Sequence, residues 1–191
     1  LVYTMPRHQD VLNLYAVNPR STVAHLLLKE SVKKYVEEEA VASIKIGDNN
    51  ILVPSDRDGY MHLYVYNHNG QLLRKVAPGN YDITAIYGMD EATGDIYYQA
   101  AALNPHDRQV YVAHKNGKIE RLTNQEGWNS AVFSGDCKYF LNSWSNYDTP
   151  YVYTTRSNDG KVLATNVDNK ALKEKIAQYG WTKKETFSFT T

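Results

Sequence analysis

Residues 63–70, Leu63-Tyr64-Val65-Tyr66-Asn67-His68-Asn69-Gly70, decide the fold class of this chain. The first four residues alternate, so Leu63 and Val65 lie on one side of a strand and the two tyrosines lie on the other. The Asn-Gly pair that follows is typical of a hairpin, because both central residues of the favoured turn need positive φ. The stretch therefore predicts a β-strand that ends in a tight turn.

The apolar-tyrosine pair at the start of this stretch recurs along the chain at intervals of 49, 47 and 42 residues. Its copies are Leu14-Tyr15, Leu63-Tyr64, Val110-Tyr111 and Val152-Tyr153. The last two copies are also followed by glycine turns, Lys115-Asn116-Gly117 and Asn158-Asp159-Gly160. Repeats of this length are typical of the four-stranded blades of a β-propeller. We therefore expect an all-β chain, a fragment of a β-propeller.

The repeat predicts about three and a half four-stranded blades, in units of roughly 1–53, 54–101, 102–145 and 146–167. We expect the first unit to lack its opening strands and the last to break off after Thr165. Too few blades are present for a closed ring, so a longer natural protein is expected.

The pattern changes over residues 168–191. Asn169 to Tyr179 predicts one short helix near the C-terminus, with Asp168 or Asn169 as N-cap and Gly180 just beyond its end. Trp181 to Thr191 predicts a strand. We interpret this part as an exit from the propeller toward another domain.

Composition places the chain among folded proteins. Apolar residues make up 42% and charged residues 22%, and Lys plus Arg equals Asp plus Glu at 21 each, so we expect no nucleic-acid partner. No apolar run approaches the roughly 18 residues that cross a bilayer, and no signal peptide stands at Leu1. Cys137 is the single cysteine, which excludes an internal disulfide.

Several stretches resemble the propeller domain of the dipeptidyl peptidase IV family, within the prolyl oligopeptidase class of serine peptidases, and its bacterial members in particular. The stretches run in order along the chain: 7–10 (RHQD), 13–15 (NLY), 55–64 (SDRDGYMHLY), 79–84 (GNYDIT), 104–111 (NPHDRQVY), 122–123 (LT), 133–140 (FSGDCKYF) and 169–172 (NKAL). Their order and spacing together are specific, although each one alone is a modest signal.

This resemblance implies an eight-bladed propeller over an α/β-hydrolase domain, in which a Ser-Asp-His triad releases N-terminal dipeptides of the Xaa-Pro or Xaa-Ala type. The chain would be the back half of the propeller, gating substrate access, and the hydrolase domain would begin after Thr191. The parent would then be a hydrolase, a serine aminopeptidase acting in proteolysis on peptide substrates, and this fragment alone would be inactive. Export to the periplasm is expected by resemblance only.

No catalytic residue is expected within the chain. A nucleophile of this class needs a Gly-x-Ser-x-Gly elbow, and Ser145 in Asn142-Ser143-Trp144-Ser145-Asn146 lacks both glycines. The acidic run Glu37-Glu38-Glu39 could be compared with the glutamates that grip the substrate's amino group in the family. Its surroundings do not match that segment, so we interpret the run as a solvated blade edge.

Metal and cofactor sites are not expected either. Asp56-Arg57-Asp58-Gly59 could be taken for a calcium loop, but the residues after it lack further oxygen ligands, and a turn at Gly59 is the better interpretation. The histidines show no metal-site spacing, and we expect them in strands and turns. They are His8, His25, His62, His68, His106 and His114.

The chain is rich in aromatic side chains, with 16 tyrosines against 4 phenylalanines. Trp128, Trp144 and the tyrosines could form a stacking platform, but in a repeat fold they more often fill the wedge between blades. A stand-alone propeller that binds protein or carbohydrate is the alternative function. The sequence assigns no substrate-binding residue. Exposed inter-blade faces should also make the fragment self-associate.

Overall fold

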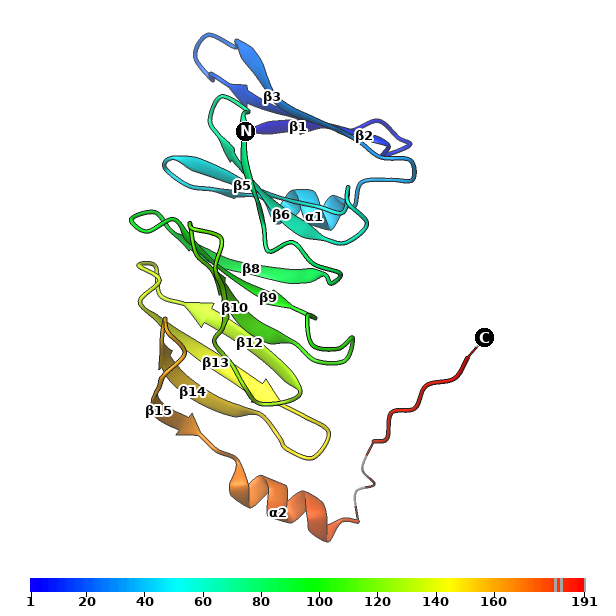
Figure 1. The fold of residues 1–191 in the computed structure, drawn as a ribbon, viewed down its shortest axis with the longest axis vertical. Helices are drawn as coiled ribbons and strands as arrows, with labels where there is room; N and C mark the ends of the chain where they lie inside the picture. The colour runs from blue at the N-terminus through cyan, green and yellow to red at the C-terminus, as the bar shows by residue number, and fades with distance from the viewer. Residues whose placement is uncertain (181, 183, 191) are drawn as a thin grey trace. The chain divides into compact units, whose positions relative to one another are not determined.

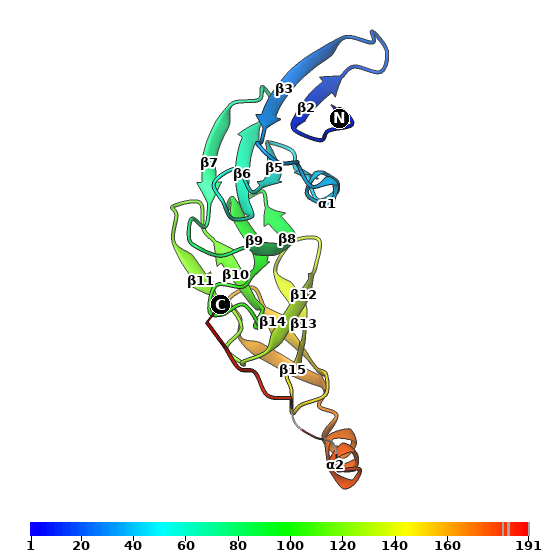
Figure 2. The same cartoon turned by 90° about the vertical axis from the view of Figure 1, so that its right-hand side faces the viewer.

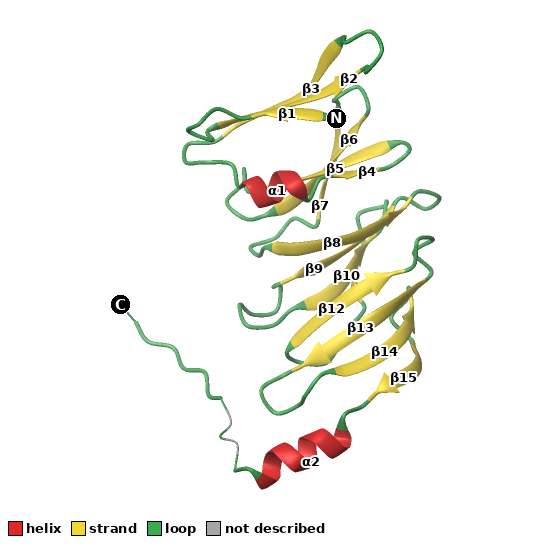
Figure 3. Cartoon of the chain, turned by 180° about the vertical axis from the view of Figure 1, so that it is seen from behind, coloured by secondary structure: helices red, strands yellow, loops and turns green. Residues whose placement is uncertain are grey.

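The computed structural model of the chain describes residues 1–180, 182 and 184–190. Within these residues it contains four antiparallel sheets and two short helices, which confirms the all-β prediction and agrees with a partial propeller (Figures 1 and 3). No helix of the described residues is long and apolar enough to span a membrane. The chain divides into two compact units, Leu1–Ile83 with Glu91–Gly94, and Thr84–Asp90 with Asp95–Thr191.

The first unit holds a three-stranded and a four-stranded sheet, each with its strands in sequence order. The three-stranded sheet consists of β1 (Val2–Thr4), β2 (Val11–Val17) and β3 (Ala24–Ser31). The four-stranded sheet consists of β4 (Lys45–Ile46), β5 (Asn50–Ser55), β6 (His62–Asn67) and β7 (Leu72–Val76). Leu14 and Leu28 of one sheet pack on Ile51, Val53 and Tyr64 of the other.

The second unit holds two four-stranded sheets, again with neighbouring strands paired in order. One consists of β8 (Ile83–Asp90), β9 (Asp95–Ala100), β10 (Gln109–Ala113) and β11 (Ile119–Arg121). The other consists of β12 (Trp128–Phe133), β13 (Tyr139–Ser145), β14 (Val152–Ser157) and β15 (Val162–Val167). The core between them contains closely packed rings, with the centroid of Phe133 4.5 Å from that of Tyr97 in a tilted pair and 4.7 Å from that of Phe140 in a stacked pair.

The repeated apolar-tyrosine pair marks the third strand of each four-stranded sheet, namely β6, β10 and β14. The glycines that follow, Gly70, Gly117 and Gly160, all have positive φ. A Cβ at Gly70 would lie 1.9 Å from the carbonyl oxygen of Leu27, and one at Gly160 would lie 2.5 Å from that of Leu122. Glycine is therefore needed there both for the turn and for close approach to the preceding sheet.

The sheets do not coincide with the predicted sequence units. The unit 54–101 contains β6 and β7 of one sheet and β8 and β9 of the next, and the last sheet runs on to Val167 instead of breaking off after Thr165. The recurring apolar-tyrosine pair lies in the third strand of each four-stranded sheet. Units counted from this pair therefore begin about half a sheet away from the first strand of the sheet.

A second short helix was not predicted. The structure places Glu38–Ala42 in helix α1, with Glu37 at its N-cap, where we had expected a blade edge. The three glutamates are exposed, whereas Val36 and Val41 are buried against Leu12. The apolar residues on either side of the acidic run thus anchor one helical turn and leave the carboxylates in solvent.

The predicted C-terminal helix is present as α2 (Lys170–Gln178), which follows β15 directly (Figure 2). Asn169 stands at its N-cap, but its side chain makes no capping bond. Gly180, just beyond the helix, has a φ of 64°, as a left-handed C-terminal residue requires. Of the strand predicted over 181–191, residues 182 and 184–190 form none, because no neighbouring strand pairs with them. The other residues of that range lie outside the described part.

A charged network joins the two sheets of the first unit. Glu30 of β3, with its side chain 5% exposed, accepts a bond from Arg57 at 2.8 Å and another from Ser55. Arg57 also donates to the hydroxyl of Tyr66 at 2.9 Å, and its guanidinium lies 4.1 Å from the centroid of the Tyr64 ring. A buried carboxylate is tolerable only with such partners.

Removing the carboxylate of Glu30 should therefore destabilise the first unit. In Glu30→Ala, Arg57 would stay half-buried without its counter-ion, and we expect the free energy of unfolding to fall by about 3 kcal/mol. Urea unfolding measures this loss. The control is Lys118→Ala, which removes an exposed ion pair with Glu120 and should leave the free energy of unfolding nearly unchanged. Equal losses in the two variants would contradict the buried role of Glu30.

His62 is buried at 1% exposure beside the rings of Tyr60 and Tyr81. Its Nε2 lies 2.9 Å from the carbonyl oxygen of Gly79 and therefore carries the proton, while Nδ1 has no hydrogen-bond partner in the described part of the chain. Burial, assisted by the charge of Lys75 and opposed by Asp58 and Asp82, lowers the pKa of His62.

This lowered pKa predicts acid sensitivity. Below about pH 6.5 the unfolded chain is protonated at His62, whereas the folded chain stays neutral there to lower pH. The free energy of unfolding should therefore fall as the pH decreases. We expect the urea midpoint of the wild type to drop between about pH 7.5 and about pH 5.5, and the drop to be smaller in His62→Gln. Parallel pH profiles for the two proteins would show that His62 is not responsible.

Candidate functional site

Two cavities flank the loop between β13 and β14 in the second unit. The first has a volume of about 510 Å³ and lies between this loop and α2. The second has a volume of about 770 Å³ and lies on the other side of the loop. Residues 145–148 line both of them. The loop 146–151 is therefore the shared wall of the candidate site.

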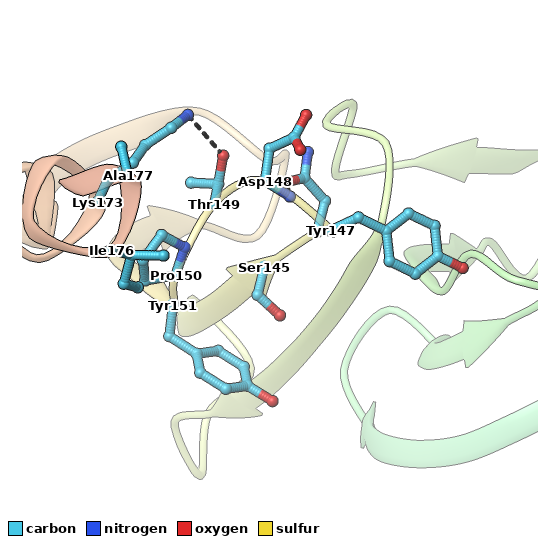
Figure 4. Close-up of a pocket in the computed structure, with 10 residues that line it drawn as sticks. Ser145, Tyr147, Asp148, Thr149, Pro150, Tyr151, Lys173, Ile176 and Ala177 are labelled. Carbon is cyan, nitrogen blue, oxygen red and sulfur yellow. Dashed lines mark hydrogen bonds between the residues drawn. The ribbon is translucent and has the colours of Figure 1, made fainter. Parts of the chain in front are cut away.

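The first cavity is formed because α2 is held against the loop. The side-chain amide of Asn169 donates to the carbonyl oxygen of Tyr151 at 2.6 Å, and the ammonium of Lys173 donates to the hydroxyl of Thr149 at 3.0 Å. Figure 4 shows the bond from Lys173, with Ile176 beside Pro150. Among the described residues that line this cavity, Lys173 is basic and Asp148 is acidic.

In the same view the ring of Tyr147 points away from α2 (Figure 4), and Tyr147 also lines the second cavity. Three loops meet there, the β9–β10 loop, the β11–β12 loop and the β13–β14 loop, together with Thr186 of the C-terminal segment. The lining residues are Asn104, Pro105, His106, Asp107, Glu126, Gly127, Trp128, Ser145, Asn146, Tyr147, Asp148 and Thr186. Carboxylates and aromatic rings thus share one depression.

Local hydrogen bonds fix the loops around the second cavity. The side-chain oxygen of Asn104 accepts the backbone N–H of His106 and of Asp107, at 2.9 and 2.8 Å. Asp107 in turn accepts the N–H of Gly127 at 3.0 Å, which ties the first loop to the second. The indole of Trp144 donates to the carbonyl oxygen of Glu126 at 2.9 Å. The walls of this cavity are therefore preformed.

A layer of buried amides lies directly behind these loops. Gln109 and Asn129, which are 1% and 0% exposed, both donate to the carbonyl oxygen of Gln125, at 2.7 and 2.9 Å. Buried Arg156 donates to the side chain of Gln125 at 3.2 Å and to the carbonyl oxygen of Leu122 at 3.4 Å. Burial lowers the pKa of Arg156. Buried polar groups that satisfy one another in this way fix a single arrangement.

Ser145 lines both cavities, but no histidine ring donates to or accepts from its hydroxyl in the described part of the chain. Its neighbours also lack the glycines of a nucleophile elbow. Among the described residues, Ser145 therefore lacks the histidine partner of a Ser-His pair.

The other residues that the sequence singled out are scattered through the fold. The backbone N–H of Gly59 donates to the carbonyl oxygen of Asp56 at 2.8 Å, which makes residues 56–59 a turn. Asp58 pairs with Lys75 at 2.7 Å, and hydrogen bonds from Lys75 and Tyr64 lower its pKa. Buried Cys137 is a free thiol whose pKa is raised by burial. No group of three or more metal-ligating side chains occurs among the described residues.

The aromatic residues divide between packing and exposure. Tyr97, Tyr98 and Tyr111 are buried, as expected of side chains that fill the space between sheets. Trp128 departs from that expectation, because it is 45% exposed at the second cavity. Sequence reasoning did not find this cavity. The sequence Asn104-Pro105-His106-Asp107 is typical of a turn and so predicts an ordered loop. It does not predict which other loops lie beside it.

Comparison with known families gives a match over residues 1–151 to the model described as the dipeptidyl peptidase IV (DPP IV) N-terminal region. Among solved structures, Porphyromonas gingivalis dipeptidyl peptidase 4 is 35% identical, with a TM-score of 0.88, over 91% of this chain and 25% of that one. A putative dipeptidyl aminopeptidase IV from Bacteroides ovatus is 20% identical, with a TM-score of 0.73 over 87% of this chain and 27% of that one, and shows likeness of fold.

Curated relatives carry similar names. The probable dipeptidyl peptidase 4 of Aspergillus flavus is 27% identical over 128 residues, which are 65% of this chain and 17% of that protein. The dipeptidyl peptidase 4 of Trichophyton rubrum is 28% identical over 130 residues, with the same coverage of 65% and 17%. The chain thus spans 17% of the length of the curated relatives it matches.

Proposed function

The chain belongs to the dipeptidyl peptidase IV N-terminal region family, and we propose that it is the non-catalytic propeller part of a serine exopeptidase that releases N-terminal dipeptides. The observation that carries this proposal is the 35% identity, at a TM-score of 0.88, to a dipeptidyl peptidase 4 over 91% of the chain. Substrates with Pro or Ala in the second position are the expected class. We also propose that the parent protein is exported to the periplasm.

In this proposal the sheets gate access and the chemistry lies elsewhere in the parent. Support comes from the arrangement of the second unit, where packed sheets present preformed loops around two cavities and no described histidine forms a hydrogen bond with Ser145. A rigid scaffold with loops at one end can select peptides by size and charge without reacting with them.

A peptidase assay distinguishes this chain from the catalytic part of the parent protein. The purified 191-residue chain should release no p-nitroaniline from Gly-Pro-p-nitroanilide, because catalysis needs a serine positioned by a histidine. A natural protein that continues beyond Thr191 should turn the substrate over, and alanine at its elbow serine should abolish turnover. The same protein should cleave a short Xaa-Pro peptide and leave a folded protein with the same N-terminus intact. Turnover by the chain alone would overturn the assignment.

One observation favours the alternative, a stand-alone module that binds protein or carbohydrate. Trp128 and Tyr147, exposed at 45% and 46%, stand at a preformed cavity, as rings do in sites that stack on ligands. A natural protein without any hydrolase sequence after Thr191, and a glycan-array signal that drops in Trp128→Ala, would favour this alternative.

The outer face of the last sheet supports the proposal that the fragment self-associates. Val132 and Leu141 lie opposite each other on β12 and β13 and are 71% and 42% exposed, and Tyr139 on the same face is 51% exposed. A contiguous apolar face of this kind tends to be covered by another surface.

Light scattering should therefore show a mass that rises with concentration for the isolated chain. Replacing one apolar residue of the face by a charge, in Val132→Glu, should shift the distribution toward the monomer, because the carboxylate would have to be buried in the contact. Val23→Glu, at a 49% exposed position in the first unit, is the matched control and should leave the mass unchanged. A constant monomer mass for the wild type would rule out the proposal.

A further inference from the structure

The outer face of the β12–β15 sheet, here the last face, carries no charged side chain among the described residues. Ala131 and Phe140 point into the core of the second unit, so their neighbours along each strand point outward. A sheet face that stays in water normally carries charged and polar side chains, whereas a face without charge is typical of a buried contact. The members of the last face are Ser130, Val132, Tyr139, Leu141, Ser143, Tyr153, Thr155, Ser157, Ala164 and Val167.

The outer face of the β1–β3 sheet, here the first face, has a similar composition. Leu14 packs in the core of the first unit, so Tyr15 points outward, where it pairs with Val2 of β1 and Leu26 of β3. Val2 and Leu26 are 50% and 51% exposed. The members of the first face are Val2, Thr4, Val11, Asn13, Tyr15, Val17, Ala24, Leu26, Lys29 and Ser31. Among these described residues, Lys29 alone is charged.

Contacts inside each unit show which side of a sheet meets the next sheet along the chain. In the first unit, Leu14 of β2 packs against the sheet that holds Tyr64 on β6. In the second unit, Val110 of β10 packs against the sheet that holds Phe140 on β13. Leu14 and Val110 are each the apolar member of the repeated pair. A sheet therefore meets the following sheet with the side that carries this residue.

The last face is a side of the same kind. Tyr153 stands seven residues before Gly160, just as Val110 stands seven residues before Gly117. Both glycines close the turn after the third strand of their sheet, so Tyr153 and Val110 occupy equivalent positions. The last face, which contains Tyr153, is therefore the side with which a sheet meets the following one.

The first face is a side of the opposite kind. Tyr15 is the equivalent of Tyr64 in the repeated pair, and Tyr64 lies on the side of its sheet that meets the preceding sheet. The first face thus corresponds to a surface that receives a preceding sheet. The two outer faces are different surfaces, and each matches one half of the sheet contact that both units already contain.

We propose that the 191-residue chain associates head to tail, with the last face of one copy packed on the first face of a second copy. The contact continues the sheet-on-sheet packing found within each unit. It joins two different surfaces and is therefore heterologous, whereas the pairing of two last faces would be isologous. This inference rests on the self-association proposed above and names the surface that covers the last face.

Two variants that each block one face test the pairing. Val132→Glu places a carboxylate on the last face, and Leu26→Glu places one on the first face, where a contact would have to bury it. By light scattering, each variant alone should keep the monomer mass of 21.8 kDa at concentrations at which the wild type associates. An equimolar mixture of the two variants should reach twice this mass and no more, because one intact face of each kind remains and both others are blocked.

Controls separate a blocked contact from a damaged fold. Val23→Glu lies in the turn between β2 and β3, outside both faces, and should associate like the wild type. Thermal melting checks that each variant folds. Should Leu26→Glu unfold, Val2→Glu on the same face carries the test, because Val2 is 50% exposed on the edge strand β1.

The outcomes distinguish this contact from self-association in general. If Leu26→Glu associates like the wild type while Val132→Glu stays monomeric, like faces pair with each other, which overturns the head-to-tail contact and leaves self-association standing. A mixture that stays monomeric although the wild type associates also overturns it. A wild type that is monomeric at every concentration overturns both, whereas family membership does not depend on the result.

Discussion

The packing of one sheet face against another is the interaction on which the rest of this structure depends. An antiparallel sheet of four short strands cannot bury enough apolar surface by itself, so each sheet of a unit is stabilised by its neighbour. In the second unit the rings of Tyr97, Phe133 and Phe140 fill the space between two sheets. Because the sheets are held by their faces, their strand ends remain outside the core, and the loops that line the two cavities lie there.

The two units use different kinds of partner for their buried polar side chains. The first unit uses a charged pair, in which Glu30 is compensated by Arg57 and the hydroxyl of Ser55. The second uses neutral amides, with Gln109 and Asn129 both donating to Gln125. Charged pairs respond strongly when one partner is lost, whereas amide layers act mainly by fixing register. The buried polar groups therefore specify how neighbouring sheets align, beyond what apolar packing alone would dictate.

Much of the fold could be predicted because the strands and turns of its repeat are marked by local sequence patterns. The pair Leu63-Tyr64 and the turn at Gly70 reveal a strand and its hairpin, since alternation and positive φ are local properties. Sheet boundaries were missed because a repeat fixes the period and not the strand at which each sheet begins. Helix α1 was missed because its burial depends on contact between Val41 and Leu12, which are distant in sequence.

The candidate site was the least predictable part, because it joins loops that the sequence separates. Over residues 125–129, residues that line the cavity are flanked by residues of the buried amide layer. Trp128 faces the cavity and Asn129 the interior, while Glu126 is exposed next to Gln125, whose carbonyl oxygen accepts two buried amides. Glu126 and Trp128 are thus each next to a residue of the buried amide layer. Any ligand that binds there meets groups already in position, so little of its binding free energy is spent on ordering the loops.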